Sequence, residues 1–297
     1  MPHSEHGLNF STYLYLMSPT YLFEAGSTKT TLLIHNNGKT VEHELPGFNP
    51  NRYSEEFENE LKVKFSIEPN PIAIGSKIYF YGSGLVEEEN KKIVKELIYT
   101  IFKVTPIVYD DVTGAARSLL GDQPGLVAIM GTGGVAAFYD GKKIVKRNGG
   151  YGYLLDDYGG GLELGKIFIS KWLNEDLPKD IEVAMSTFIK TSKQDFILEL
   201  YRKNDLKILA SVVQIIPQFL NDVVVNKIVA QYFNTFFERH VATILPFYPS
   251  NTMAIVGSIG LHFREIIEAQ GVLFGLKEFK FIDRPAQDLI DYHLKKG

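Results

Sequence analysis

The sequence predicts an α/β protein with two similar lobes, each a mixed sheet with flanking helices. Two observations support this prediction: each half opens with three short strands joined by tight turns, and each then alternates helices with strands. The chain has 297 residues, 45% of them hydrophobic, which is enough to form two cores. We expect the first lobe at residues 1–110 and the second at residues 111–284.

The first half begins with three expected strands over residues 21–45, with a hairpin turn at Asn37-Gly38, a dipeptide favoured in tight turns. A helix is expected over 53–65, where Phe57, Leu61 and Phe65 recur in four-residue steps. The elements expected after it are a buried strand over 77–84, a helix over 87–102, a strand over 106–111 and a helix over 113–121.

The second half repeats this order. A strand over 125–130 enters the glycine turn "GTGG", and residues 135–149 read as a hairpin about Asp140-Gly141. The elements expected after it are a glycine-rich loop over 149–165, helices over 162–245, a strand over 252–257, a helix over 261–270 and a final helix over 285–297. The aromatic residues of "QYFNTFFERH" are expected to pack the helical part of this lobe.

Composition excludes several classes of function. The net charge of −4 and pI near 6.0 give no electrostatic footprint for nucleic acid or a membrane surface, so small molecules or proteins are the expected partners. The absence of cysteine excludes disulfides, thiolate metal sites, a cysteine nucleophile and a cysteine-ligated iron–sulfur cluster. The histidines show no HxxxH spacing of the kind that binds metal.

The N-terminus does not resemble a signal peptide, and no apolar run reaches the roughly 18 residues of a membrane helix. We expect a cytoplasmic protein. Residues 1–19 are expected to be a disordered lead-in, or translation begins at Met17. A homodimer stays an open alternative, because one sequence does not separate core from interface.

Two glycine turns stand at equivalent places in the two halves, "EAGSTKT" at residues 24–30 and "MGTGG" at residues 130–134. The first is not a P-loop, because a strand follows it where a P-loop needs a helix. In such a turn several backbone N–H groups can point the same way and cradle phosphate oxygens. One turn alone is more often a plain β-turn, but two in a repeated fold favour a phosphate site.

The ordered segments "FEAGSTKT", "PGFNP", "YGSG", "YDDVTGAARSL", "AIMGTGG", "GGYGYLLDDYGGG", "AIVGSIG" and "PAQDLIDYH" resemble the BadF/BadG/BcrA/BcrD ATPase family. Within it they are most similar to the N-acetylglucosamine kinase-like members, which belong to the actin, sugar kinase and Hsp70 superfamily. The resemblance covers the chain from about Tyr21. It implies duplicated actin-like (ribonuclease H-like) lobes with a cleft between them, a helical insertion in the second lobe, and a C-terminal helix, 285–297, that returns to the first lobe.

The resemblance also implies a site for ATP and Mg²⁺. Glu24 matches the acidic position that organises Mg²⁺ through water. A hard cation such as Mg²⁺ keeps several waters and uses few carboxylates, so one acidic residue is enough at such a site. The residues matching the ATP phosphate turns are Gly26, Ser27, Thr28 and Lys29, with Gly131, Thr132 and Gly133; those matching the adenosine segment are Gly257, Ser258 and Gly260. The plainer interpretations are a solvated lysine at a strand end for Lys29 and a tight turn for the adenosine segment.

Asp111 matches the catalytic base in the family pattern Asp-x-x-Gly-Ala-Ala. A kinase needs one carboxylate to accept the proton of the attacking hydroxyl. The alternative is an aspartate that caps the helix expected to begin near Thr113. The residues implied for the sugar are Asn49, Gly82, Ser83, Gly84 and Asp157, although Asn49 before Pro50 is also a common turn residue.

The implied function is an ATP-dependent phosphotransferase acting on a sugar hydroxyl, with N-acetylglucosamine or a related amino sugar as substrate. The alternatives are a non-catalytic or regulatory protein that binds sugar or nucleotide, and an ATPase of unknown coupling. The family's radical-enzyme activase role is excluded, because its cluster needs cysteine ligands.

Four positions depart from the family pattern. Gly134 stands where relatives commonly have serine, and one hydroxyl donor is therefore missing. Asp156 replaces a glycine, Tyr158 replaces a carboxylate, and Asp288 stands where relatives usually have glycine. These departures leave the choice of sugar open.

Overall fold

The computed structural model describes residues 18–26, 28–52, 55–66, 75–203 and 206–296. The chain forms two compact units: unit 1 comprises Met1–Ser118 with Pro285–Gly297, and unit 2 comprises Leu119–Arg284. The predicted lead-in over 1–19 lies almost wholly outside the described residues, as do Met17 and Ser27.

Unit 1 contains one five-stranded sheet and its helices. Its elements are β1 (Thr20–Ala25), β2 (Lys29–Asn36), β3 (Lys39–Pro46), the 3₁₀ turn η1 (Pro50–Arg52), α2 (Glu55–Ser66), β4 (Lys77–Gly82), α3 (Glu88–Phe102), β5 (Ile107–Asp110), α4 (Asp111–Leu120) and, at the end of the chain, α12 (Ala286–Lys296). The last two residues of α4, Leu119 and Leu120, already count with unit 2.

Unit 2 contains a second five-stranded sheet and a larger helical part. Its elements are β6 (Gly125–Met130), β7 (Gly134–Tyr139), β8 (Ile144–Gly149), α5 (Gly161–Leu173), α6 (Lys179–Ile189), α7 (Lys193–Lys203), α8 (Lys207–Ser211), the 3₁₀ helix η2 (Val212–Phe219), α9 (Val223–Phe236), the π-helical turn η3 (Phe237–Val241), β9 (Thr252–Val256), α10 (Ser258–His262), α11 (Arg264–Leu273) and β10 (Glu278–Ile282).

The two sheets have the same topology. Their strand orders are β3-β2-β1-β4-β5 and β8-β7-β6-β9-β10. In each unit the first three strands pair antiparallel, and the last two strands extend the sheet in parallel. This confirms the predicted fold class of two mixed sheets with flanking helices. It also explains the order of elements in the sequence: tight turns join the antiparallel strands, and helices lie in the longer crossovers that parallel strands need.

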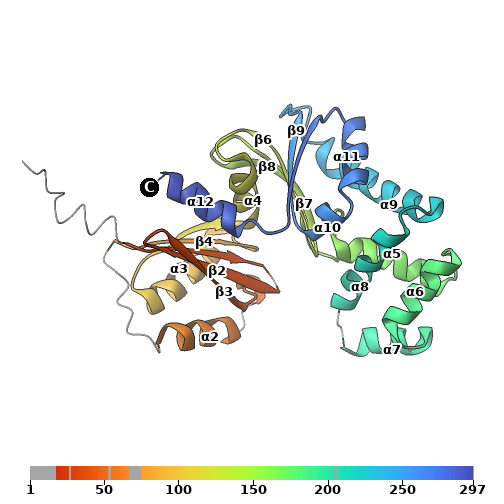
Figure 1. Cartoon of the computed structure of the whole chain (residues 1–297), viewed down its shortest axis with the longest axis horizontal. Helices are drawn as coiled ribbons and strands as arrows, with labels where there is room; N and C mark the ends of the chain where they lie inside the picture. Colours follow the sequence, from red (N-terminus) through yellow and green to blue (C-terminus); the bar gives the residue numbers. More distant parts are fainter. Residues whose placement is uncertain (1–17, 27, 53–54, 67–74, 204–205, 297) are drawn as a thin grey trace, which may run out of the picture. The chain divides into compact units, whose positions relative to one another are not determined.

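The sheet of unit 1 is covered on both faces. Tyr21, Phe23 and Ala25 of β1 pack with the apolar sides of α2 and α3, whereas Leu22 packs on the other face with residues of α12. Figure 1 shows α2 and α3 on one side of this sheet and α12 on the other. Strand β1 is therefore buried on both faces, which fits its continuous apolar run, whereas most of β3 is exposed.

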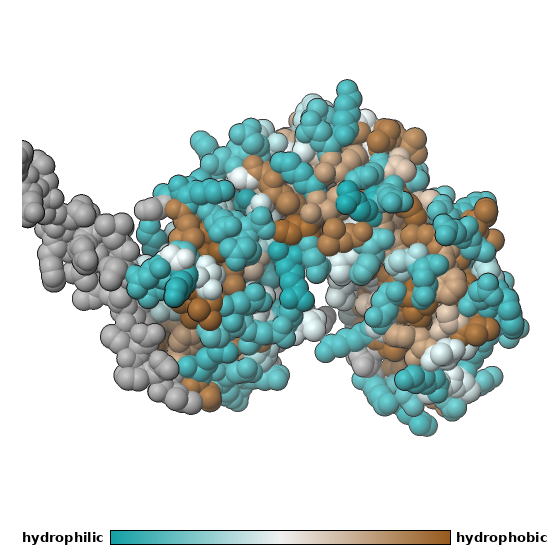
Figure 2. All heavy atoms as spheres, in the orientation of Figure 1, coloured by the Kyte–Doolittle hydropathy of each residue, from teal (hydrophilic) through white to brown (hydrophobic). Residues whose placement is uncertain are grey.

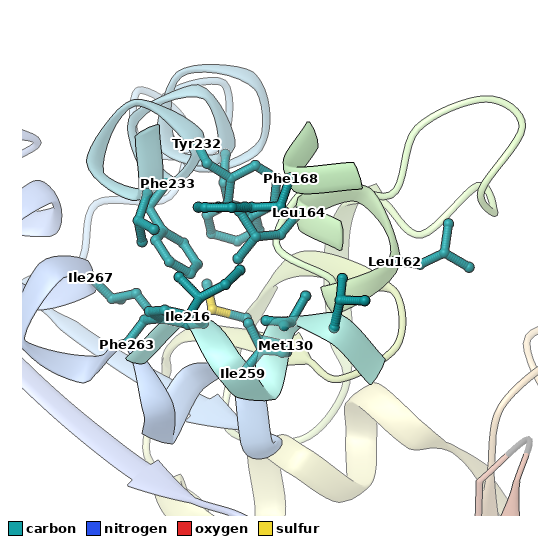
Figure 3. Packing of buried hydrophobic residues seen from close by; sticks show 14 of the residues in the cluster. Met130, Leu162, Leu164, Phe168, Ile216, Tyr232, Phe233, Ile259, Phe263 and Ile267 are labelled. Carbon is teal, nitrogen blue, oxygen red and sulfur yellow. The ribbon is translucent and has the colours of Figure 1, made fainter. Parts of the chain in front are cut away.

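The core of unit 2 is built by its helices on one face of the second sheet. Leu126, Ala128 and Met130 of β6 belong to one buried cluster, whose other members include residues of α5, η2, α9, α10 and α11. Figure 3 shows Met130 among Phe168, Ile216 and Phe233 of this cluster. Asp222 caps α9, because its carboxylate accepts the amide N–H groups of Val224 and Val225 at 2.8 and 3.1 Å.

The boundary between the units differs from the prediction. It falls after Ser118 rather than after Asp110, so most of α4 belongs to unit 1. The physical reason is close packing: a Cβ atom at Gly114 would lie 3.0 Å from the Tyr81 ring and 3.4 Å from Leu289. Small residues on α4 let the helix approach the sheet, and this contact is not visible in local sequence.

Two local predictions for the second half were incomplete. No strand was expected over 278–282, yet β10 pairs with β9 there; its alternation of Glu278 and Lys280 with aromatic residues is typical of an edge strand. The helix expected over 261–270 begins at Ser258 and breaks at Phe263, whose φ of −116° is not helical.

A polar network crosses the sheet of unit 1 beneath α12. Arg117 donates to the Tyr81 hydroxyl at 2.9 Å, and that hydroxyl lies 2.7 Å from Nε2 of His293. The imidazole stacks on Tyr79 at 3.5 Å. Burial, together with the positive charges of Arg117, Lys296 and Lys77, lowers the pKa of His293 to about 3. The imidazole is therefore neutral, and in the tautomer with its proton on Nδ1 it accepts the Tyr81 proton at Nε2.

This network predicts a pH dependence of stability. The unfolded chain takes up the histidine proton below about pH 6.5, while folded His293 stays neutral down to about 3. Stability from this group is thus complete above pH 6.5 and falls as the pH drops through that window. We expect His293→Gln to flatten the fall in melting temperature between about pH 7 and pH 4. A variant with the wild-type slope, followed by circular dichroism, would contradict this assignment.

The surface carries single apolar side chains on both units (Figure 2). The largest exposed fractions are those of Tyr201 (83%), Val223 (80%), Leu154 (79%) and Leu155 (79%). Scattered apolar residues are normal on monomers and do not define an interface, so the homodimer stays a prediction. No helix in the described ranges combines the length and the hydrophobicity that a membrane crossing requires.

Candidate functional site

The carboxyl ends of the three parallel strands of unit 1 lie side by side. Ala25 of β1 pairs with Gly82 of β4, and Gly82 pairs with Asp110 of β5. The candidate residues Gly26, Ser83 and Asp111 each follow one of these strand ends directly. Ligands of open α/β sheets bind at this kind of edge, so the sequence places its unit 1 candidates where the fold can use them.

The loop with Asn49 joins this edge. The amide N–H of Phe48 donates to the Gly26 carbonyl at 3.1 Å, and Asn49 Nδ2 donates to Ser83 Oγ at 3.3 Å. A Cβ atom at Gly84, whose φ is +75°, would lie 2.7 Å from Asn49 Oδ1. The structure therefore brings Asn49 together with the loop of Gly82, Ser83 and Gly84.

Asn49 is also a turn residue, as its alternative interpretation proposed. Its Oδ1 accepts the amide N–H of Asn51 at 2.9 Å, an Asx turn. Asn90 of α3 closes the same loop, since its Nδ2 donates to Asn51 Oδ1 and to the Gly84 carbonyl at 2.9 and 2.7 Å. Asn90 was missed by sequence reasoning, because a lone Asn within a helix carries no motif.

The two aspartates at the start of α4 have separate positions. Asp110 caps the helix: its Oδ1 accepts the Thr113 amide at 3.1 Å and its Oδ2 accepts the Thr113 hydroxyl at 2.7 Å. Asp111 is the first helical residue, and its Oδ1 lies 2.9 Å from the Val112 amide. The helix thus begins before the expected Thr113, and its capping geometry belongs to Asp110 rather than to Asp111.

The first glycine turn is described except for Ser27. Gly26 closes it by donating its N–H to the Lys29 carbonyl at 2.9 Å, and Thr28 is exposed. Lys29 Nζ lies 2.6 Å from Glu44 Oε2, and the two side chains are 34% and 67% exposed. An ion pair this exposed contributes little, so the ammonium can leave it for a stronger anion at small cost. Glu24 pairs in register with Tyr81, on the sheet face that α4 and α12 cover.

In unit 2 the second glycine turn and the adenosine segment lie next to each other. β6 and β9 are parallel neighbours, and Ile129 pairs with Val256 at their carboxyl ends. A Cβ atom at Gly257, which has φ of +120°, would lie 2.4 Å from the Met130 carbonyl and 3.1 Å from the Gly131 nitrogen. Only glycine fits there.

The carbonyl groups of the second turn are held by the start of α5. Gly161 and Leu162 donate their amide N–H groups to the carbonyls of Gly131 and Thr132, at 2.7 and 3.0 Å. In a trans peptide the C=O and the following N–H point in opposite directions. The N–H groups of Thr132 and Gly133 are therefore directed away from α5, and they donate to no acceptor in the part of the chain that the structure describes.

Asp157 lies with this turn. Its Oδ1 accepts the Gly134 amide at 3.2 Å, and a Cβ atom at Gly133 would lie 2.7 Å from the same oxygen. Burial raises the pKa of Asp157, while the hydrogen bond from Gly134 acts against this rise and the nearby Glu163 adds to it. Asp157 is thus in unit 2, whereas the other residues proposed for the sugar are in unit 1.

Ser258 and Gly260 stand at the start of α10. Ser258 is exposed and Gly260 is buried. A side chain at position 260 would be too close to β9, because its Cβ atom would lie 2.5 Å from Ile255 Cγ2. Gly260 therefore lets α10 pack on β9, which is a structural requirement independent of any ligand. Of the adenosine candidates, Gly257 has the direct contact with the second turn.

A buried tyrosine that sequence reasoning assigned only to core packing touches this region. The Tyr232 hydroxyl of α9 accepts the Gly159 amide at 2.8 Å and donates to the Gly160 carbonyl at 2.6 Å. Burial raises the pKa of Tyr232 well above its usual value. No local pattern distinguishes it from the aromatic residues around it.

None of the residues described forms a cluster of three His, Asp or Glu side chains that could hold a metal ion. The carboxylates near the candidate turns, Glu24 and Asp157, stand one in each unit. A metal ion at either turn would therefore take most of its ligands from water and phosphate, as Mg²⁺ commonly does.

Comparison with solved structures identifies proteins that share this fold. The chain superimposes on a candidate N-acetylglucosamine kinase from Porphyromonas gingivalis with a TM-score of 0.83 and 28% identity, over 93% of this chain and 99% of that one. A candidate N-acetylglucosamine kinase from Chromobacterium violaceum gives 0.69 and 16%, over 93% and 99%. The chain has the actin-like fold of sugar kinases.

The same fold occurs in a protein with another role. A transcriptional regulator of the ROK family, a homolog of the E. coli Mlc protein, matches with a TM-score of 0.63 and 11% identity, over 94% of this chain and 80% of that one. At this identity the match shows the fold alone. No family model matches the sequence, and no curated protein matches it significantly.

Proposed function

We propose that the chain is an ATP-dependent sugar kinase of the BadF/BadG/BcrA/BcrD family, acting on N-acetylglucosamine or a related amino sugar. One observation carries the proposal: the second glycine turn directs two amide groups that have no acceptor among the described residues, those of Thr132 and Gly133, away from α5, and Gly257 packs directly against this turn. The 28% identity to a candidate N-acetylglucosamine kinase over nearly the whole chain supports it.

The residues present fit a nucleotide phosphate chain. Two consecutive amides with no acceptor among the described residues are suited to phosphate oxygens. At Gly131, where a Cβ atom would have no atom within 4 Å, the backbone of the turn is open to a ligand. In this proposal the turns at 26–29 and 131–133 hold the phosphates and Gly257 lies against the adenosine. Mg²⁺, when bound, supplies charge that offsets the phosphates, with Glu24 holding it through water.

Asp111 is the proposed catalytic base. Asp110 serves as the cap of α4, and Asp111 follows the strand edge that also holds Ser83 and Asn49. In this proposal Asn49 and the 82–84 loop orient the sugar, Asp111 accepts the proton of its hydroxyl, and the oxygen attacks the γ-phosphate.

The second candidate function is a regulator that binds sugar or nucleotide without transferring phosphate. The match to a ROK-family regulator favours keeping it, because it shows that this fold does not by itself imply catalysis. The departures at Gly134, Asp156 and Tyr158 fall in unit 2. The kinase is favoured because Asp110 caps α4, so that Asp111 is not required for this structural role.

The test is ADP release with a panel of sugars. We expect N-acetylglucosamine or another amino sugar to stimulate ATP consumption above the rate without sugar, and glucose to do so more weakly, because the site must recognise the acylamino group by hydrogen bonds. If no sugar stimulates ADP release while ligands still raise the melting temperature, the regulator is the correct function. Direct detection of the sugar phosphate excludes a contaminating ATPase.

A further inference from the structure

One buried side chain, Tyr232, holds the loop before α5 by two hydrogen bonds to Gly159 and Gly160, and we call this pair of bonds the clasp. Tyr232 is buried, and its hydroxyl makes two hydrogen bonds to adjacent peptide groups, accepting from Gly159 N–H at 2.8 Å and donating to Gly160 C=O at 2.6 Å. Both backbone groups lie in a buried segment, where an unpaired polar group is costly. A tyrosine hydroxyl is a donor at neutral pH, and burial raises the pKa of Tyr232 still further.

The clasped loop is the surface on which the second glycine turn rests. A Cβ atom at Gly134 would lie 2.0 Å from the Tyr158 carbonyl, and one at Gly160 would lie 2.4 Å from the Gly133 carbonyl carbon. The two backbones are thus in direct contact with no side chain between them. Because the two backbones touch, the turn has to move with the loop whenever the loop moves.

The clasp also acts through the helix start. Gly160 is the N-cap of α5 and has no side chain to cap it. The next two amides, of Gly161 and Leu162, hold the carbonyls of Gly131 and Thr132. The direction of the Thr132 and Gly133 amides therefore depends on where Gly160 lies, and Tyr232 fixes Gly160.

We propose that Tyr232 is a positioning residue for nucleotide: its hydroxyl sets the loop and helix start that direct the amides of the second glycine turn at phosphate. This inference rests on the proposed function. Tyr232 is a core residue that touches no substrate, and in this proposal it controls the affinity for the phosphates of ATP and not the affinity for the sugar.

The test is Tyr232→Phe, which removes only the hydroxyl and keeps the ring contacts with Tyr158 and Phe233. We expect the KM and Kd for ATP to rise about tenfold, as for one lost buried hydrogen-bonding group, while the KM for sugar is unchanged. The control is Tyr248→Phe. That ring stacks on Phe138 in the same unit, and its hydroxyl bonds to no described residue, so ATP affinity should not change.

A second measurement needs no nucleotide. Amide hydrogen exchange over residues 158–162 should be faster in Tyr232→Phe than in the wild type and unaffected in Tyr248→Phe, because the Gly159 amide loses its acceptor. Faster exchange with unchanged ATP affinity would overturn the positioning role, and unchanged exchange would overturn the clasp itself. A wild type without affinity for ATP would overturn the proposed function, and with it the positioning role, while the exchange result would still decide the clasp.

Discussion

Replacing Asp111 by Asn should lower kcat by about a thousandfold while leaving the Kd for ATP nearly unchanged. Loss of a positioned general base typically costs 10²–10⁴-fold in rate. Asn keeps an oxygen that can accept from the Val112 amide at the start of α4, so the helix should form normally. The measurement is steady-state ADP release with the best sugar of the panel, alongside calorimetric titration with ATP.

The control for this substitution is its neighbour. Asp110→Ala removes the cap that accepts from the Thr113 amide and hydroxyl, and we expect it to cost about 1 kcal/mol of stability. The two variants should therefore differ: Asp111→Asn should lose turnover at an unchanged melting temperature, whereas Asp110→Ala should have a lower melting temperature. If Asp111→Asn kept wild-type turnover, the base would have to be another residue.

Replacing Gly134 by Ser should destabilise unit 2 by about 3 kcal/mol, at the upper end of the usual overpacking cost. A Cβ atom there would lie 2.0 Å from the Tyr158 carbonyl and 2.7 Å from the Gly160 nitrogen, and backbone atoms cannot move aside as a flexible side chain can. The melting temperature of unit 2 should fall by roughly 10 °C. ATP affinity should fall as well, since the turn and the loop have to separate.

The matched control is Gly131→Ala in the same turn. A Cβ atom at Gly131 has no atom within 4 Å, so this variant should keep the stability of the wild type. Differential scanning calorimetry of both variants tests the contrast. A Gly134→Ser protein as stable as the wild type would show that the loop of Tyr158 and Gly160 can move away from the turn.

The steric contact at Gly134 connects two departures that are separate in the sequence. The resemblance to the BadF/BadG/BcrA/BcrD family singled out Gly134, in the second glycine turn, and Asp156 and Tyr158, in the loop before α5, as departures from the family pattern. Here the loop backbone occupies the space that a serine side chain would need. Tyr158 stacks on Tyr232 at 5.4 Å, which seats the loop in this position. The residues at 134 and 158 are therefore in direct steric contact, and a side chain at 134 is incompatible with this position of the loop.

The sequence by itself determined the fold class, because hydrophobic periodicity and turn residues are local signals. The runs in β1, β4, β6 and β9 are apolar enough to be buried strands, and Asn37-Gly38 and Asp140-Gly141 encode their own turns. The glycine turns were found for the same reason. The edge strand β10 was missed because its charged residues conceal it, although the repeat required a partner for β9.

Only the tertiary structure decided how residues distant in the chain combine. It separated the cap Asp110 from Asp111, placed Asp157 against the second glycine turn, and put the hydroxyl of Tyr232 on the loop before α5. These contacts join residues up to 73 positions apart in the chain. Such contacts depend on side-chain geometry and on backbone packed against backbone, which leave no periodicity in the sequence.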